Sequence, residues 1–268
     1  MIFDLVNGQF IKQGDQIFGT EISEQCLFSD SIRSVRNQLM FWNEHVALIN
    51  LQFQLLNQEI PVFMKNEGRE LKRQIERALV KNKFFRSARI DLLLYGGNKM
   101  INYLIRVKPI ESAAYELNTE GIIIEPFRKT FKANSPLSSL RMGSDPYWKI
   151  VRAFQSSPIT ELILENEKRC LLEAPERNLY LIQGVNIHTV AAHSGVYLDP
   201  AREIIREISG KAGFSFNEDE FLDEEDLQQA EEVFLAGDLY GIQWVKGIGK
   251  KRYLSKKIRK LNDLLNQE

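Results

Sequence analysis

The residues that could do chemistry gather in the second half of the chain, and Glu173 is the first of them. It precedes Asn178 by five residues in the segment RCLLEAPERNLYLIQG, whose apolar residues are typical of buried strands. One glutamate alone predicts no function, so the interpretation depends on what accompanies it.

A second group, Asp199–Pro200–Ala201–Arg202, opens a predicted helix that runs from Pro200 to about Gly210. The free amides at a helix N-terminus commonly bind anions such as phosphate. Here Asp199 is predicted to accept hydrogen bonds from those amides, and Pro200 to fill the first helical position. A carboxylate at this point would compete with a phosphate and repel it.

The composition limits the class of protein that carries these residues. The chain has 268 residues, of which 44% are apolar and 26% are charged, and its net charge is −1. This is ordinary for a soluble globular protein with a sizeable core, and it predicts no general attraction to nucleic acid or membranes. Two cysteines and three scattered histidines predict neither a disulfide framework nor a metal site. We expect a cytoplasmic protein without a membrane span.

The pattern of elements predicts an α+β protein of two domains, with antiparallel or mixed sheets and flanking helices. We expect a smaller N-terminal domain over residues 1–117 and a larger one over 118–268. The strongest patterns are helices at residues 42–61, 67–82, 146–155, 200–210 and 250–266, strands at residues 88–97, 101–110, 122–125, 161–166, 169–174 and 231–237, and a hairpin over residues 177–190 around Gly184.

Six motifs in this order resemble the class IV, pyridoxal-phosphate-dependent aminotransferases. This family includes branched-chain aminotransferases, D-amino acid aminotransferases and aminodeoxychorismate lyase. The resemblance is carried by NGQF, CLFSDSIRS, WNEHVALINLQFQLLNQEIP with His45, the Glu173–Asn178–Tyr180 segment, GVYLDPAREII with Arg202, and EEVFLAGDLYGIQWV.

The resemblance implies a D-amino acid aminotransferase-like architecture, fold type IV, with pyridoxal phosphate in a cleft between two domains of a homodimer. It implies that a lysine forms a Schiff base with the cofactor and that Glu173 faces the pyridine nitrogen. It also implies that an arginine, helix-terminal amides and threonine hydroxyls hold the phosphate.

The lysine is the first part that departs from the family pattern. In the family it lies somewhat over thirty residues before the glutamate, and Arg141 lies 32 residues before Glu173. Arginine stays charged at neutral pH and cannot form the Schiff base. Lys149, at 24 residues, is the alternative lysine, and Lys132, at 41 residues, is a poorer match. Arg141 could instead pair with Asp145 within one helical turn.

The phosphate site departs from the pattern as well. The family's phosphate arginine falls on Leu48, its helix-terminal group on Asp199, Pro200 and Ala201, and its second threonine on Asp238. Each carboxylate beside a phosphate could cost a few kcal/mol in water-poor surroundings. We therefore expect that pyridoxal phosphate is not bound covalently. A further possibility is that the protein binds no cofactor at all.

Three functions from different classes remain open. The first is a non-catalytic protein that binds a small cationic or neutral ligand in the inherited cleft. The second is an active aminotransferase or 4-amino-4-deoxychorismate lyase that uses an atypical lysine such as Lys149. The third is a protein or nucleic-acid interaction module that uses the basic C-terminal helix. An apolar stripe of Leu254, Ile258, Leu261 and Leu265 favours docking of that helix on the core and makes nucleic acid a less favoured partner.

Overall fold

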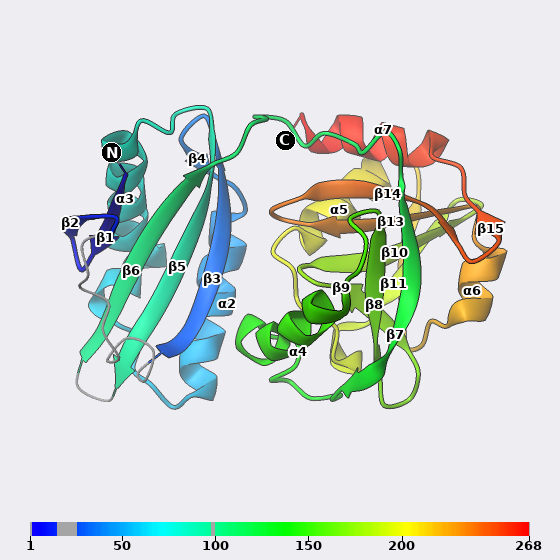
Figure 1. Ribbon diagram of the computed structural model, residues 1–268, viewed down its shortest axis with the longest axis horizontal. Coiled ribbons are helices and arrows are strands. Elements are labelled where there is room, and N and C mark those ends of the chain that lie inside the picture. Colours follow the sequence, from blue (N-terminus) through cyan, green and yellow to red (C-terminus); the bar gives the residue numbers. More distant parts are fainter. Residues whose placement is uncertain (1, 15–25, 98–99, 268) are drawn as a thin grey trace. The chain divides into compact units, whose positions relative to one another are not determined.

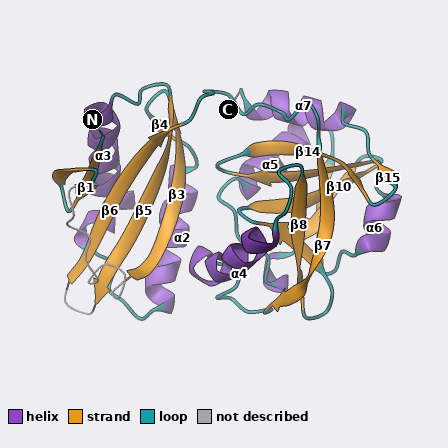
Figure 2. Ribbon diagram, in the orientation of Figure 1, coloured by secondary structure: helices purple, strands orange, loops and turns teal. Residues whose placement is uncertain are grey.

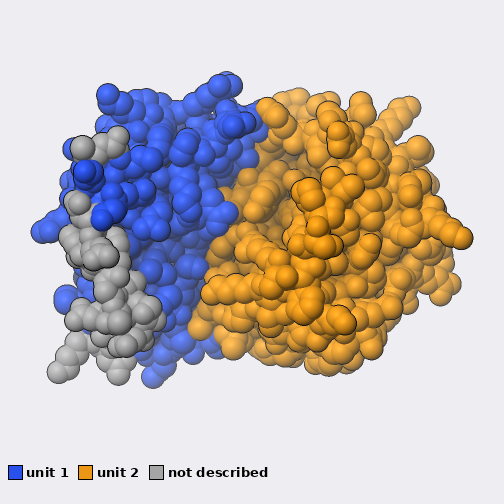
Figure 3. All heavy atoms as spheres, in the orientation of Figure 1, with its two compact units in different colours: residues 1–114 blue, residues 115–268 orange. Residues whose placement is uncertain are grey.

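The structure is a computed structural model that describes residues 2–14, 26–97 and 100–267. The chain divides into two compact units, Met1–Ala114 and Tyr115–Glu268, which are coloured separately in Figure 3. Each unit has its own sheet and its own helices (Figure 2).

Within its described residues, unit 1 is a six-stranded sheet with two helices over one face (Figure 1). The strand order is β2-β1-β6-β5-β3-β4, and every pairing between the described strands is antiparallel. The strands are β1 (Phe3–Val6), β2 (Gln9–Lys12), β3 (Cys26–Val35), β4 (Gln38–Leu39), β5 (Ser87–Gly97) and β6 (Met100–Pro109), and the helical segments are α2 (Trp42–Leu55), η1 (Val62–Met64) and α3 (Lys65–Asn82).

Alternation along the central strands explains which face the helices cover. Ile32 on β3 lies opposite Ile90 on β5, which in turn lies opposite Val107 on β6. All three side chains are buried on the same face, because paired residues of neighbouring strands point to the same side of a sheet. Phe28 of that face stacks edge-on against Phe53 of α2 with ring centroids 5.0 Å apart.

Unit 2 is a mixed sheet of nine strands with helices packed around it. Antiparallel pairs predominate, and β11–β12, β14–β7 and β7–β8 are parallel. The strands are β7 (Ile122–Lys132), β8 (Thr160–Asn166), β9 (Leu171–Ala174), β10 (Arg177–Gln183), β11 (Asn186–Val190), β12 (Ser215–Asp219), β13 (Glu232–Gly237), β14 (Gly241–Ile248) and β15 (Lys251–Arg252).

Six of these strands close on themselves. The pairings run β10-β13-β14-β7-β8-β9, and β9 also pairs with β10. The ring surrounds a core of aliphatic side chains that includes Leu172, Leu179 and Leu235. The helical segments of this unit are α4 (Arg141–Phe154), η2 (Ala192–Ser194), α5 (Arg202–Lys211), α6 (Glu224–Gln229) and α7 (Lys256–Leu265). The expected α+β class with antiparallel and mixed sheets is confirmed.

Two element boundaries near the site differ from the sequence prediction. The strand expected at residues 122–125 continues to Lys132, because β7 pairs with β8 as far as Lys132 opposite Asn166. The helix expected from Pro146 begins at Arg141, so Pro146 lies inside α4. Gly143 allows this early start, since a Cβ there would lie 2.2 Å from the carbonyl oxygen of Leu137.

The C-terminal helix α7 docks on its own unit. Ile258, Leu261 and Leu265 are buried, as the stripe predicted. Leu254 is a correction, because it precedes the helix and its side chain is 70% exposed. No helix within the described residues is long and apolar enough to cross a membrane.

Candidate functional site

Glu173 is the centre of a buried polar cluster in unit 2. It lies on β9, directly opposite Asn178 on β10, and its side chain is fully buried. Its Oε1 accepts hydrogen bonds from Lys132 Nζ at 2.7 Å and from Trp148 Nε1 at 2.9 Å, while Oε2 accepts the backbone N–H of Tyr197. Both carboxylate oxygens are therefore bonded to donors of the chain itself.

Lys132 brings a positive charge into this cluster from the end of β7. Its side chain has no exposed area, and its ammonium forms an ion pair with Glu173. Burial lowers the pKa of Lys132, while the charge and the hydrogen bond of Glu173 oppose that effect. A fully buried pair of this kind is strongly coupled, because removal of either partner leaves the other charge without compensation.

Arg141 begins α4 and is also buried, with 7% of its side chain exposed. Its Nη2 donates to Glu176 Oε1 at 2.5 Å, and its guanidinium lies 5.5 Å from the centre of the Trp148 ring. Its Nε lies 3.6 Å from Asp145 Oδ1, which confirms the expected ion pair within one turn. Trp148 thus links Arg141 to Glu173, since its indole ring stacks with the arginine and its N–H donates to the glutamate.

Glu176 receives donors from three different residues. Besides Arg141, Arg152 of α4 donates to Oε2, and the Tyr240 hydroxyl donates to the same oxygen at 3.3 Å. Glu176 lies in the tight turn between β9 and β10 with a φ of 62°. This is the left-handed region, which non-glycine residues rarely adopt. The carboxylate is buried with the turn that carries it.

Asp199 and Asp238, the two carboxylates at expected phosphate positions, lie on chain segments that contact each other. Asp199 Oδ1 accepts the backbone N–H of Ala201 at 2.8 Å and that of Asp238 at 3.0 Å. The predicted capping role needs a correction, because α5 begins only at Arg202 and Ala201 is its N-cap. Asp199 instead closes a turn one step before the helix and ties that turn to the end of β13.

Two other residues of the family motifs have structural contacts. Asn178 is fully buried, and its Nδ2 donates to the carbonyl oxygen of Tyr197 at 2.9 Å. Arg202 donates from Nη2 to the carbonyl oxygen of Val190 at 2.6 Å and to Glu218 Oε1 at 2.8 Å. These bonds fix the segment before α5 against the sheet and so hold Asp199 and Tyr197 in place.

The remaining predicted positions are Leu48 and His45 on α2 of unit 1 and Lys149, which directly follows Trp148 on α4. Leu48 is half-buried on α2 of unit 1, where its carbonyl oxygen accepts Gln52 Nε2 at 3.4 Å. His45 of the same helix is buried, and its Nδ1 contacts Asp30 Oδ2 at 2.8 Å. The alternative lysine, Lys149, is exposed on α4.

Sequence reasoning missed Lys132 and Glu176 as members of the cluster. Lys132 lies far from Glu173 along the chain, which makes it a poor match for the family lysine. Glu176 stands inside the signature segment, between Glu173 and Asn178, and a charged residue in a strand-to-strand turn gives no reason to expect burial. The signal that could have found it is the adjacent Pro175, which with Glu176 forms a two-residue connection between two apolar strands.

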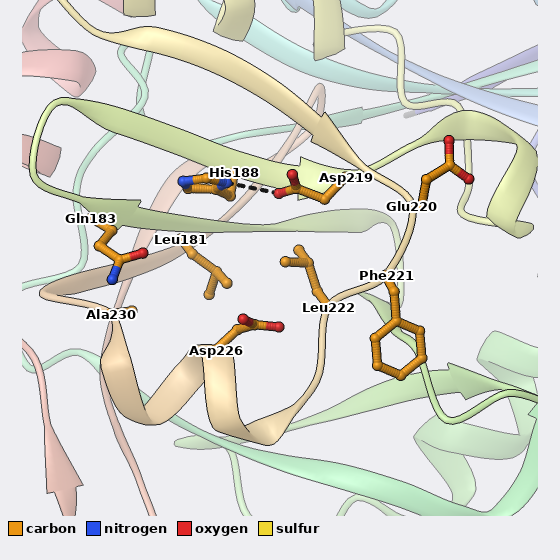
Figure 4. Close-up of a pocket in the computed structure, with 9 residues that line it drawn as sticks. All are labelled: Leu181, Gln183, His188, Asp219, Glu220, Phe221, Leu222, Asp226 and Ala230. Carbon is orange, nitrogen blue, oxygen red and sulfur yellow. Dashed lines mark hydrogen bonds and ion pairs between the residues drawn. The ribbon is translucent and has the colours of Figure 1, made fainter.

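A surface pocket of about 400 Å³ lies elsewhere in unit 2, between β10, β11 and α6 (Figure 4). Among its lining residues, His188 Nδ1 contacts Asp219 Oδ2 at 2.8 Å, and the side chains of Leu181 and Leu222 point toward each other. None of the predicted site residues lines this pocket. Within residues 2–14, 26–97 and 100–267, no cluster of His, Cys, Asp or Glu is arranged to hold a metal ion.

Comparisons with known proteins agree with the architecture. The family model for "Amino-transferase class IV" matches residues 28–248. A branched-chain aminotransferase from Thermoproteus uzoniensis, solved with norvaline, has a TM-score of 0.82 at 14% identity over 98% of this chain and 93% of that one.

Two further solved structures are similar to the chain. The branched-chain amino acid aminotransferase from Escherichia coli has a TM-score of 0.81 at 16% identity, over 98% and 93% of the two chains. A Legionella pneumophila protein assigned as a 4-amino-4-deoxychorismate lyase has a TM-score of 0.77 at 16% identity, over 95% and 96%. A search of curated proteins by sequence finds no match. The family model covers most of the chain, and the chain therefore belongs to the class IV aminotransferase family.

Proposed function

We propose that this family member has given up pyridoxal phosphate chemistry and is a non-catalytic binder of a small molecule. In this proposal Arg141 occupies the position of the catalytic lysine, and the phosphate site is lost. The observation that carries the proposal is the state of Glu173. The carboxylate that would face a pyridine nitrogen is bonded by the Lys132 ammonium, the Trp148 indole and the Tyr197 amide.

The cofactor's own geometry supports this interpretation. In pyridoxal phosphate, the aldehyde carbon and the ring nitrogen lie at opposite ends of the pyridine ring. A lysine bonded to one end and a carboxylate bonded to the other must therefore be separated by the whole ring. Lys132 Nζ lies 2.7 Å from Glu173 Oε1, which leaves no room for a ring between them. Lys132 thus does not fit as the Schiff-base lysine.

The residues at the expected phosphate positions fit the cofactor no better. The amides of Ala201 and Asp238 already donate to the Asp199 carboxylate. Two carboxylates, those of Asp199 and Asp238, are buried at these positions, where a phosphate would bring roughly two more negative charges. Leu48, which the resemblance places at the phosphate arginine, carries no charge. The donor set therefore supports the loss of phosphate binding.

Titration with pyridoxal phosphate tests the proposal directly. We expect the purified protein to develop no visible absorbance band that borohydride abolishes, because Arg141 forms no Schiff base. The matched variants are Lys132→Met and Lys149→Met. A stable, reducible band in the unmodified protein that disappears in one of these variants would establish an active lysine and reject the proposal.

The proposal also includes a homodimer, as the resemblance implies. Light scattering coupled to size-exclusion chromatography measures this independently of any ligand. We expect twice the mass of one chain at micromolar concentration. A mass equal to one chain would reject the homodimer. It would not affect the proposed loss of pyridoxal phosphate chemistry, which depends on the contacts of Glu173.

A further inference from the structure

We propose that Arg141, Arg152 and Tyr240 form a binding site for the carboxylate of a small molecule, which Glu176 occupies in the absence of that ligand. This inference rests on the proposed function and deepens it, because it names the chemical class of the ligand. It concerns the Glu176 side of the polar cluster, not the closed side around Glu173.

The geometry around Glu176 is that of a carboxylate receptor. Arg141 donates to one oxygen at 2.5 Å, and Arg152 and Tyr240 donate to the other. Charge-assisted bonds from guanidinium groups are the strongest that a carboxylate receives in proteins, and they fix its orientation. The three donors come from both ends of α4 and from the segment between β13 and β14, so the receptor does not depend on the turn that carries Glu176.

Glu176 can exchange with a ligand because both carboxylates would compete for the same donors. The backbone of Glu176 has a φ of 62°, a conformation that suits glycine or asparagine. The β9–β10 turn imposes this conformation, which is the same whether or not the side chain binds the arginines, so it does not oppose the exchange. A ligand that takes over the bonds from the two arginines would release the glutamate side chain, whose carboxylate water can then hydrate.

Access to the receptor is through Arg152. Its side chain is 45% exposed, whereas those of Arg141 and Glu176 are 7% and 2% exposed. The Oε2 end of the bound carboxylate therefore lies nearest to solvent. A small anion can contact Arg152 first and then exchange with Glu176 as the side chain withdraws.

The charges select an anion over the cationic or neutral ligand that the sequence suggested. Glu173 and Asp199 carry carboxylates that could attract a cation, but both accept hydrogen bonds from the chain itself. When Glu176 withdraws, Arg141 keeps its contact with Asp145, but Arg141 and Arg152 lose the carboxylate that they share. An anion restores that charge, and a carboxylate matches the spacing of the donors that Glu176 now satisfies.

Calorimetric titration with sodium propionate, which has the size of the glutamate side chain, tests the inference on the full-length protein. The key variant is Glu176→Gln, which keeps the shape of the side chain but removes the competing charge. We expect the Kd for propionate to fall at least about tenfold relative to the unmodified protein, because the internal competitor is weakened. Sodium chloride at equal ionic strength should give no comparable heat.

A second variant keeps the test decisive if Glu176→Gln does not fold. Arg152→Met changes a half-exposed side chain, and we expect it to weaken propionate binding to the otherwise unmodified protein at least about tenfold. Arg259→Met, which removes the same charge from the exposed surface of α7, is the matched control and should leave the Kd unchanged.

Equal propionate affinity in the unmodified protein and in both site variants would overturn the inference. So would chloride or sulfate binding with the same affinity as propionate, since that would indicate a general anion site only. The pyridoxal phosphate titration of the same samples decides the proposed function separately. A protein without a reducible band and without propionate binding would keep the proposed function and reject this ligand class.

Discussion

The ion pair between Lys132 and Glu173 provides the sharpest quantitative test of the site. The perturbation is Lys132→Met, which keeps the length and the apolar stem of the side chain and removes only the charge. Glu173 would then be a buried carboxylate without its cation. Breaking a buried pair in this way costs about 3–5 kcal/mol of unfolding free energy. Glu173→Gln should cost a similar amount, because it leaves the Lys132 ammonium buried and uncompensated.

The double variant Lys132→Met/Glu173→Gln separates the pair energy from other effects. At 2.7 Å and an effective dielectric constant of about 20, the attraction between the charges is about 6 kcal/mol, which desolvation partly offsets. We expect a coupling energy of at least about 2 kcal/mol. In Glu173→Gln the new side-chain amide could place its NH₂ group against the backbone N–H of Tyr197, which would cost free energy. This cost occurs in both the single and the double variant, so it cancels in the coupling energy.

Urea unfolding followed by circular dichroism measures the four free energies, with separate transitions fitted if the units unfold independently. The pair Lys257–Glu231 is a matched control, because it has the same residue types at 2.5 Å with side chains 30% and 50% exposed. Its coupling should stay below about 1 kcal/mol. A Lys132–Glu173 coupling no larger than this control would refute the view that the buried pair holds the site closed.

Two further changes test the surroundings of the site. Gly237→Ala should destabilise the protein by about 1–3 kcal/mol in urea unfolding, since its Cβ would lie 2.2 Å from the carbonyl oxygen of Glu176; Gly210→Ala, which meets nothing within 4 Å, should instead be neutral or stabilising. Burial raises the pKa of Glu218, but the bonds and charges of Arg202 and Arg206 outweigh it and hold that pKa below 4.5. Glu218 therefore contributes stability above about pH 4.5 that is lost as the pH falls through its folded pKa, and Glu218→Gln should make the urea midpoint less sensitive to acid; an unchanged pH dependence would contradict this.

The sequence predicted those parts of the site that depend on local spacing. Glu173 and Asn178 are five residues apart, and a two-residue turn between β9 and β10 brings them directly opposite each other. The Arg141–Asp145 pair followed equally from helical spacing, because residues four apart lie on one face of a helix. In each case the geometry depends on a single hairpin or a single turn, which a short stretch of sequence determines.

Lys132 could not be placed in the same way. It lies beyond a register shift between Phe127 and Lys132, so alternation along β7 does not indicate which face its side chain takes. Its contact with Glu173 also spans 41 residues and two further elements of the sheet. Such a contact depends on how β7, β8 and β9 pair, and pairing between distant strands is decided by packing of the whole unit.

The two surprises, Lys132 and Glu176, are linked by the physics of buried charge. Without Lys132 and Glu176, the site would contain Glu173 with no cation and Arg141 with only the carboxylate of Asp145, 3.6 Å away. Each uncompensated charge would cost several kcal/mol, comparable to the total stability of a typical domain. Lys132 supplies the first missing charge and Glu176 the second, so that the cluster is neutralised by its own side chains. The difference lies in access. Lys132 is fully buried, so its ion pair with Glu173 has a structural role. The arginines around Glu176 reach solvent through Arg152. At that end of the cluster, the carboxylate of Glu176 can still be exchanged for a carboxylate from solution.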